Sequence, residues 1–181
     1  MPAHSPPEGW RDEPVRLVAY DDTWPSQFAA EAALLAQVMG SGVTGGVHHV
    51  GSTAIPGMPA KPIIDILVGV PDLSTARADI PRLASLGYLH APYRPDEMVW
   101  FCKPDPAHRT HHLHLVPTGS PRFADELAFR DYLQAHSATA AAYAELKADL
   151  ATRFRTDREA YTEGKSSFVA AVLAAARHSP I

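Results

Sequence analysis

The segment PIIDILVGV at residues 62–70 constrains the fold of this chain most strongly, because only one of its residues is polar or charged. A continuous apolar run of this length predicts a central β-strand that is covered on both faces. Asp65 is the exception. A carboxylate in a buried strand is costly unless a cation, a metal ion or a hydrogen-bond donor lies beside it. We therefore expect a functional partner next to Asp65.

A Gly-Ser-Thr turn precedes this strand. The segment VHHV at 47–50 is predicted to be a short strand, and Gly51, Ser52 and Thr53 follow it. Such a turn presents backbone N–H groups and two hydroxyls on one side, and Lys61 adds a nearby cation. This is the set of donors that a phosphate needs. The same residue types also form ordinary tight turns, so a purely structural role stays open.

The segment RTHHLHLVP, which begins at Arg109, is the second polar motif. In a strand, His112 and His114 share one face while His111 lies on the other, where a structural role is expected. Two imidazoles at this spacing can bind one metal ion or one phosphate, and Asp65 can complete the set. The alternative is a pair of polar residues on the solvated face of an edge strand. Arg109, in the turn before the strand, is either a phosphate contact or a solvated residue.

Helical periodicity and short β-segments surround these motifs. The pattern predicts a helix over 21–40, a helix over 73–87 that Pro81 must bend or interrupt, strands near 88–93, 97–103 and 111–117, and a helical tail from 123 to 178. This order predicts an α/β (α+β) protein, with a mixed β-sheet flanked by helices and with C-terminal helices packed back on the sheet. Residues 1–14 are predicted to be disordered or loosely ordered, and 15–178 to form a single domain.

Two lysines of the tail are further candidates. Lys165 follows Tyr161 by four residues, which places both on one helical face and makes Lys165 a possible anion contact. Lys147, also on a helix, is a weaker candidate. For both residues the alternative is a solvated surface charge, which is the commoner role of lysine on a helix.

Composition excludes several classes of protein. A net charge of -4 over 181 residues argues against general affinity for nucleic acid. One cysteine, Cys102, excludes an intramolecular disulfide framework and any CxxC metal site, which favours a reducing cytoplasm. No signal peptide is expected, because residues 1–14 lack a hydrophobic segment, and no membrane helix is expected, because no apolar run approaches about 20 residues. The Ala-rich terminal helix allows a homodimer contact, although packing on its own sheet explains it equally well.

Five ordered motifs resemble the GrpB-like proteins from about Val15 to Val172: HVGSTAIPGMPAKPIIDILVGV, RTHHLHLV, LAFRDYLQAH, YAELKADL and AYTEGKSSF. The resemblance implies a fold of the nucleotidyltransferase superfamily. Some relatives of that family are fused to dephospho-CoA kinase, which implies nucleotide or coenzyme A chemistry.

The superfamily pattern combines a Gly-Ser turn that opens a helix with three carboxylates that bind two metal ions. Here Gly51 and Ser52 match the turn and Asp65 matches one acid, but Ile63 or Leu67 stands where the second acid belongs. Histidines replace the third acid. A site of Asp65, His112 and His114 suits a single Zn²⁺ or Mn²⁺ ion better than a pair of Mg²⁺ ions.

Three functional hypotheses remain. The first is metal-dependent nucleotidyl or phosphoryl transfer, in which Ser52 and backbone amides hold the phosphates while a catalytic set binds the divalent metal ion. The second is a catalytically lapsed module that binds a nucleotide, a coenzyme A precursor or another phosphorylated small molecule. The third is a single-metal phosphoesterase. The expected catalytic residues are Ser52, Asp65, His112 and His114, of which Asp65, His112 and His114 bind the metal ion. The expected ligand contacts come from Gly51, Ser52, Thr53, Lys61, Arg109 and Lys165.

Overall fold

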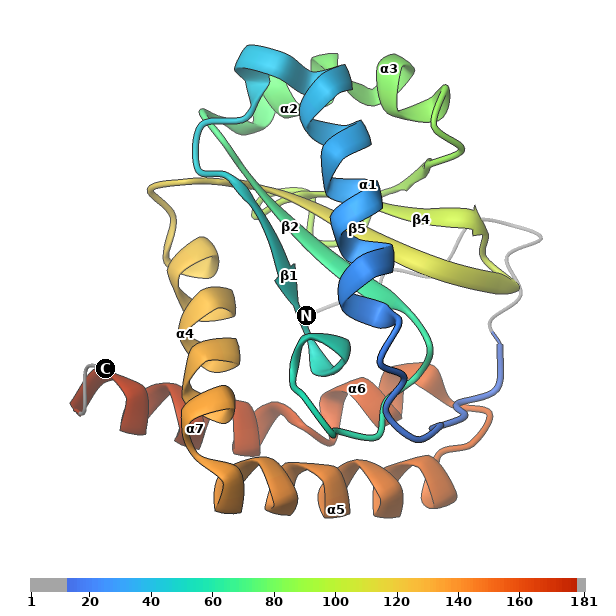
Figure 1. Cartoon of the computed structure of the whole chain (residues 1–181), viewed down its shortest axis with the longest axis vertical. Helices are drawn as coiled ribbons and strands as arrows, with labels where there is room; N and C mark the ends of the chain where they lie inside the picture. Colours follow the sequence, from blue (N-terminus) through green and yellow to red (C-terminus); the bar gives the residue numbers. More distant parts are fainter. Residues whose placement is uncertain (1–12, 179–181) are drawn as a thin grey trace.

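The computed structural model describes residues 13–178, which form a five-stranded mixed sheet with helices on both faces (Figure 1). The strands lie in the order β1-β2-β5-β4-β3. Only β2 and β5 pair in parallel, and the other neighbours are antiparallel. The strands are β1 (Val47–Val50), β2 (Ile64–Val70), β3 (Leu89–Ala91), β4 (Val99–Asp105) and β5 (His108–Pro117). The fold class predicted from the sequence is confirmed.

The helices are α1 (Trp24–Met39), α2 (Leu73–Ala78), α3 (Ile80–Ala84), α4 (Pro121–Ala135), α5 (Ser137–Arg153), α6 (Arg158–Glu163) and α7 (Ser166–His178), with short 3₁₀ turns η1 (Gly40–Gly42) and η2 (Ser52–Ala54). The helix predicted over 73–87 is divided at Asp79, just before Pro81, because proline cannot donate the next helical hydrogen bond. Asp72 caps α2 through the backbone N–H of Thr75.

Alternation along β2 separates the two faces of the sheet. Ile64, Ile66 and Val68 are fully buried in the large core that α1 covers. Leu67 and, by alternation, Asp65 lie on the opposite face, where Leu67 belongs to the smaller core that includes Phe123 of α4. The central strand is thus covered on both faces, as its apolar sequence predicts. Its one carboxylate faces the side of the C-terminal helices.

The C-terminal helices extend the structure beyond the sheet. Buried Ile55 and Met58, which follow η2, pack with Leu133 of α4, Tyr143 of α5 and Val172 of α7. Figure 1 shows α5 and α7 crossing below the sheet, with α6 between them along the chain. The loop from Ile55 toward β2 is therefore enclosed by the C-terminal part of the chain.

The predicted terminal helix is interrupted at Gly164. A Cβ atom at this position would lie 2.6 Å from a terminal methyl group of Leu150, so a larger residue here would require the Leu150 side chain to move. Lys165 consequently lies between α6 and α7, although its Nζ is still 4.5 Å from the ring centroid of Tyr161. Tyr161 and Lys165 therefore lie close together, as predicted, although they do not belong to one continuous helix.

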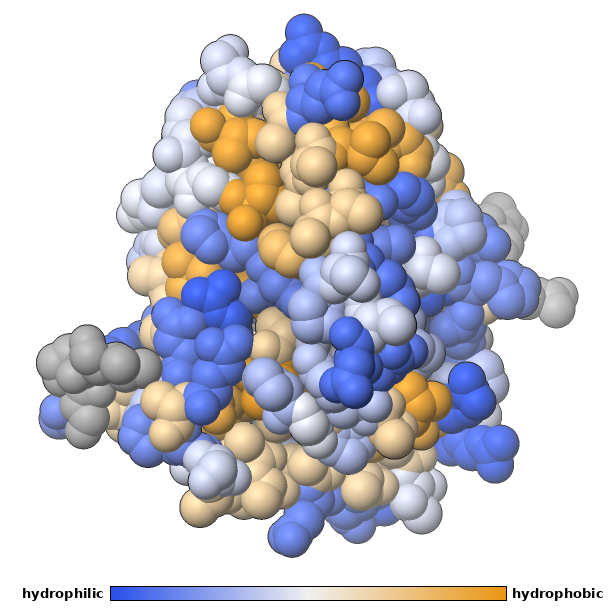
Figure 2. Space-filling view, in the orientation of Figure 1, coloured by the Kyte–Doolittle hydropathy of each residue, from blue (hydrophilic) through white to orange (hydrophobic). Residues whose placement is uncertain are grey.

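The surface on the α1 side is partly apolar. Figure 2 shows apolar residues gathered on the upper part of the molecule, in the region of the C-terminal half of α1, where Leu34 is 43% exposed. This surface lies on the face of the sheet opposite Asp65 and is separate from the candidate site. Among the helices of residues 13–178, none has the length and apolar character that a membrane span requires. The sequence predicts disorder or loose order for residues 1–14. Of these, residues 1–12 lie outside the part of the chain that the structure describes.

Candidate functional site around Asp65

Asp65 and His112 form the centre of the site. They are direct partners in the parallel register of β2 and β5, and His112 Nδ1 lies 2.8 Å from Asp65 Oδ1. Burial alone would raise the pKa of Asp65. The hydrogen bond from His112 and the positive charges of His114 and Lys61 outweigh burial and hold that pKa well below its usual range. The side chain of Asp65 is 27% exposed, so the ionised carboxylate is accessible to a ligand.

The tautomer of His112 follows from its two partners. A carboxylate only accepts hydrogen bonds, so Nδ1 carries the proton and donates to Asp65. Arg158 Nη2, which only donates, lies 3.4 Å from Nε2, the acceptor. Burial lowers the pKa of His112 to about 4, although Asp65 opposes this effect, and the imidazole is therefore neutral at pH 7. The Trp100 ring lies beside it, with 5.1 Å between the ring centroids.

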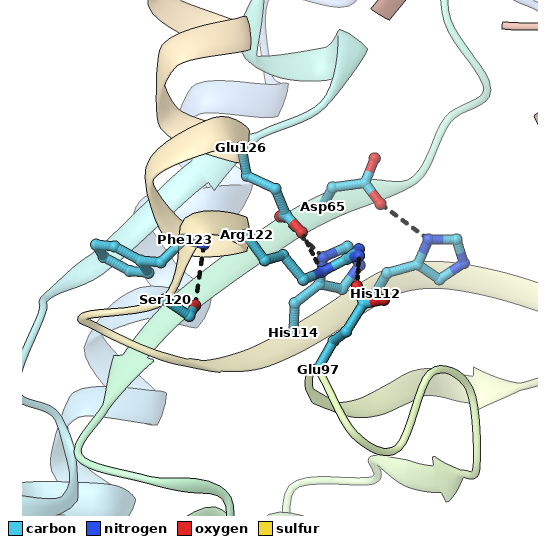
Figure 3. Close-up of polar contacts among 8 residues, drawn as sticks. All are labelled: Asp65, Glu97, His112, His114, Ser120, Arg122, Phe123 and Glu126. Carbon is cyan, nitrogen blue, oxygen red and sulfur yellow. Dashed lines mark hydrogen bonds and ion pairs between the residues drawn. The ribbon is translucent and has the colours of Figure 1, made fainter. Parts of the chain in front are cut away.

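His114 has a different acidic partner, Glu126 of α4 (Figure 3). Its Nδ1 lies 3.1 Å from Glu126 Oε2, and Arg122 Nε forms an ion pair at 2.9 Å with the other carboxylate oxygen. Arg122 also donates to Glu97 at 2.8 Å. Burial alone would lower the pKa of His114, but the charge and hydrogen bond of Glu126 raise it overall. The two histidines thus lie on one face, as predicted, and each has its own carboxylate.

This arrangement does not fit the metal site expected from the sequence. His112 and His114 each direct Nδ1 at a different carboxylate, and Nε2 of His112 faces a guanidinium, which repels a metal ion. Within residues 13–178, no group of three or more His, Cys, Asp or Glu side chains is arranged to hold a metal ion. Asp65 and His112 are brought together, while His114 is held by Glu126.

Three of the four lysines in the chain interact with the charge of Asp65, which favours the charged form of each. Burial, with repulsion from Arg158 and Lys165, lowers the pKa of Lys61 to about 7. Burial also lowers the pKa of Lys147 to about 7 and that of Lys165 to about 8. We call these three lysines and Arg158 the cation cluster.

Two buried tyrosines separate the cations. The ring of Tyr161 lies 5.3 Å from Lys61 Nζ and 4.5 Å from Lys165 Nζ, distances that suit cation–π attraction. The ring of Tyr143 lies 5.1 Å from Lys147 Nζ, and Ser52 is close enough to the Tyr143 hydroxyl to favour its ionised form. Tyr143 of α5 therefore lies between Lys147 and the Gly51-Ser52 turn.

Thr53 and Arg109, two other predicted ligand contacts, each have partners within the protein. Thr53 is buried, donates to the Ile63 carbonyl at 3.2 Å and lies 2.9 Å from His49 Nε2, so its hydroxyl has a structural role. Arg109 is buried, donates to the Pro106 carbonyl and lies over the Trp100 ring at 5.6 Å. Its charge contributes to the lowered pKa of Lys61, which places it at the margin of the site.

Sequence reasoning missed Arg158, Tyr143 and Glu126 as site residues and gave Lys147 little weight. Arg158 and Tyr161 are separated by three residues on α6, and Tyr143 and Lys147 by four on α5. These are the spacings at which two side chains lie on the same face of a helix. This spacing, together with the burial of Lys147, identifies the faces of α5 and α6 that are directed at Asp65.

Gly51 allows the backbone of the turn to approach Asp65. Its φ is +70°, and a Cβ atom there would collide with the Asp65 carboxylate. We expect Gly51→Ala to break the Asp65–His112 hydrogen bond and to cost about 1–3 kcal/mol more than Gly57→Ala. Gly57 also has positive φ, but nothing lies within 4 Å of its added Cβ, so it controls for backbone strain. Urea unfolding and the ¹⁵N shifts of His112 measure both effects. Equal losses in the two variants would contradict the close approach.

Comparison with known proteins identifies the family of this chain. A UPF0157 protein of Pseudomonas aeruginosa is 42% identical, over 94% of this chain and 72% of its own length. A dephospho-CoA kinase of Mycolicibacterium paratuberculosis is 30% identical over 84% of this chain, but only 43% of that protein is matched. The crystal structure of conserved protein GrpB from Enterococcus faecalis superimposes with a TM-score of 0.80 at 30% identity, covering 89% of this chain and 96% of that one. Because the GrpB protein family also matches residues 14–175, the chain belongs to the GrpB family.

Proposed function

We propose that this protein binds a phosphorylated small molecule, such as a nucleotide or a coenzyme A-related metabolite, at the cation cluster. One observation carries the proposal: the charge of Asp65 acts on three of the chain's four lysines, and Arg158 lies 3.4 Å from His112, the partner of Asp65. Glu126 does not neutralise the positive charge of the cation cluster, because its carboxylate is already paired with His114 and Arg122. The site therefore holds an excess of positive charge.

The energetic argument concerns the lysines. Holding several ammonium groups together away from water is unfavourable, which is why burial and mutual repulsion lower their pKa values. A bound phosphate offsets that cost, because each lysine then has an anionic partner. Ser52 and the phenols of Tyr143 and Tyr161 provide additional hydrogen-bond donors. The relative named as a dephospho-CoA kinase supports a nucleotide or coenzyme A-related compound as the ligand class.

A transfer activity is a second candidate. The Asp65–His112 pair beside the Gly51-Ser52 turn supports it, since an imidazole oriented by a carboxylate can act as a general base or nucleophile. Phosphoryl transfer and phosphoester hydrolysis are reactions in which such a pair can act. A binding module without activity has the same cation cluster and differs only in forming no product.

We expect anion binding to be independent of a divalent metal ion, because the side chains of Asp65, His112 and His114 do not converge on one point. Metal content is measured on the purified chain, and pyrophosphate binding is measured by calorimetry before and after chelation. Unchanged affinity is the expected result. Stoichiometric zinc or manganese that disappears in the His114→Ala variant would contradict it and support the metal site expected from the sequence.

Replacing Lys165 by methionine should weaken pyrophosphate binding by about 10- to 100-fold, the equivalent of about 1.5–3 kcal/mol for a hydrogen bond to a charged group. Arg153→Met is the matched control, because it also removes one positive charge but from a side chain that is 60% exposed. Calorimetry with pyrophosphate compares the two variants. Equal affinities in both would show that total charge, not the cation cluster, determines binding.

Sulfate is a suitable probe of the pH dependence, because its charge is constant from pH 6 to 9. Lysine is charged only below its pKa, and the values in the free protein are about 7 for Lys61 and Lys147 and about 8 for Lys165. Sulfate affinity should therefore be highest below pH 7 and fall roughly tenfold or more as the pH rises through 7 to 9. The Lys165→Arg variant, which stays charged, should lose less affinity. A flat profile would contradict the lowered lysine pKa values.

A further inference from the structure

His112 has one fixed tautomer in the described structure. Nδ1 donates to Asp65 Oδ1 at 2.8 Å, and Nε2 is the atom that faces Arg158 at 3.4 Å. Because the guanidinium can only donate, the lone pair of the imidazole is on Nε2. The side chain is 11% exposed, so this lone pair lies at the boundary between the sheet and the cation cluster.

The geometry points to His112 as a phosphorylation site, at which Nε2 accepts a phosphoryl group from a phosphoric anhydride or an acyl phosphate. This inference rests on the proposed function, because the cation cluster must first bind the phosphoryl oxygens of the donor. Histidine is a known type of covalent nucleophile, and a carboxylate on Nδ1 keeps Nε2 available for attack.

The surrounding charges suit both the donor and the product. Arg158 lies next to Nε2 and is close enough to Lys61 for its charge to help lower the pKa of that lysine. After transfer, the phosphoryl oxygens replace the imidazole lone pair as acceptors for Arg158. Asp65 stabilises the positive charge that develops on the ring.

Transfer of the phosphoryl group to Nε2 requires no oxidant. The Nε2 lone pair forms a bond to phosphorus, while the bond from phosphorus to the bridging oxygen breaks. The leaving phosphate or carboxylate departs with that electron pair. The proton stays on Nδ1, hydrogen-bonded to Asp65. Hydrolysis or transfer to an acceptor hydroxyl then regenerates the free imidazole.

Two other histidines of β5 provide controls. His111 lies on the opposite face of the sheet, where its Nδ1 is 2.8 Å from the Thr110 hydroxyl. His114 is paired with Glu126 and Arg122 and is farther along the strand from the register position of Asp65. Among the histidines of residues 13–178, only His112 has both a carboxylate at Nδ1 and a cation at Nε2.

The test incubates the full chain with acetyl phosphate and, separately, with a nucleoside triphosphate, followed by intact mass spectrometry and site mapping. We expect a mass gain of one phosphoryl group that is labile in acid, stable in base and located on His112. His112→Asn should abolish it, Asp65→Asn should slow it roughly tenfold or more because the tautomer is no longer fixed, and His111→Gln should retain it.

Pyrophosphate calorimetry on the same samples separates the two proposals. If pyrophosphate binds but neither donor gives an adduct, or the adduct lies on another residue, phosphorylation of His112 is overturned while the proposed binding function stands. If pyrophosphate does not bind the unsubstituted chain, the proposed function fails. Mapping on the unsubstituted chain keeps the test decisive even if His112→Asn does not fold.

Discussion

The hydrogen bond between Asp65 and His112 is the interaction on which the organisation of the site depends. A charge in the central strand of a sheet is tolerated only when donors and cations compensate for lost hydration. The parallel register of β2 and β5 supplies the donor directly opposite, and the C-terminal helices supply the cations. The turn at Gly51 then has to pass close to the carboxylate, which requires a residue without a side chain.

Much of the fold could be predicted from the sequence, because short sequence patterns indicate most of its strands and helices. The apolar run around Asp65 identified the central strand, and alternation placed His112 and His114 on one face and His111 on the other, as the structure has them. Pro81 predicted the break between α2 and α3. The break between α6 and α7 at Gly164 was not predicted, and the contact of this position with Leu150 of α5 depends on packing between helices.

The composition of the site was harder to predict for the same reason. Asp65 and Lys61 lie in one segment, whereas Arg158, Tyr143 and Lys147 reach Asp65 only through the packing of α5 and α6. A helical lysine is usually solvated, and nothing in the local sequence of Lys147 distinguishes it from that majority. Likewise, the spacing of two histidines suggested one shared ligand, but α4 places Glu126 against His114 and divides the pair.

The hydrogen bond from Lys147 Nζ to the carbonyl of Pro59, at 2.6 Å, joins α5 to the loop that carries Lys61. During synthesis on the ribosome, the first half of the site emerges long before the second, and this contact can form only when both halves are available. A chain that ended between β5 and α5 would retain the strands that carry Asp65 and His112 but would lose the counter-charges from α5 and α6. Affinity for the proposed phosphorylated ligand would therefore report whether the polypeptide is whole as well as whether it is folded.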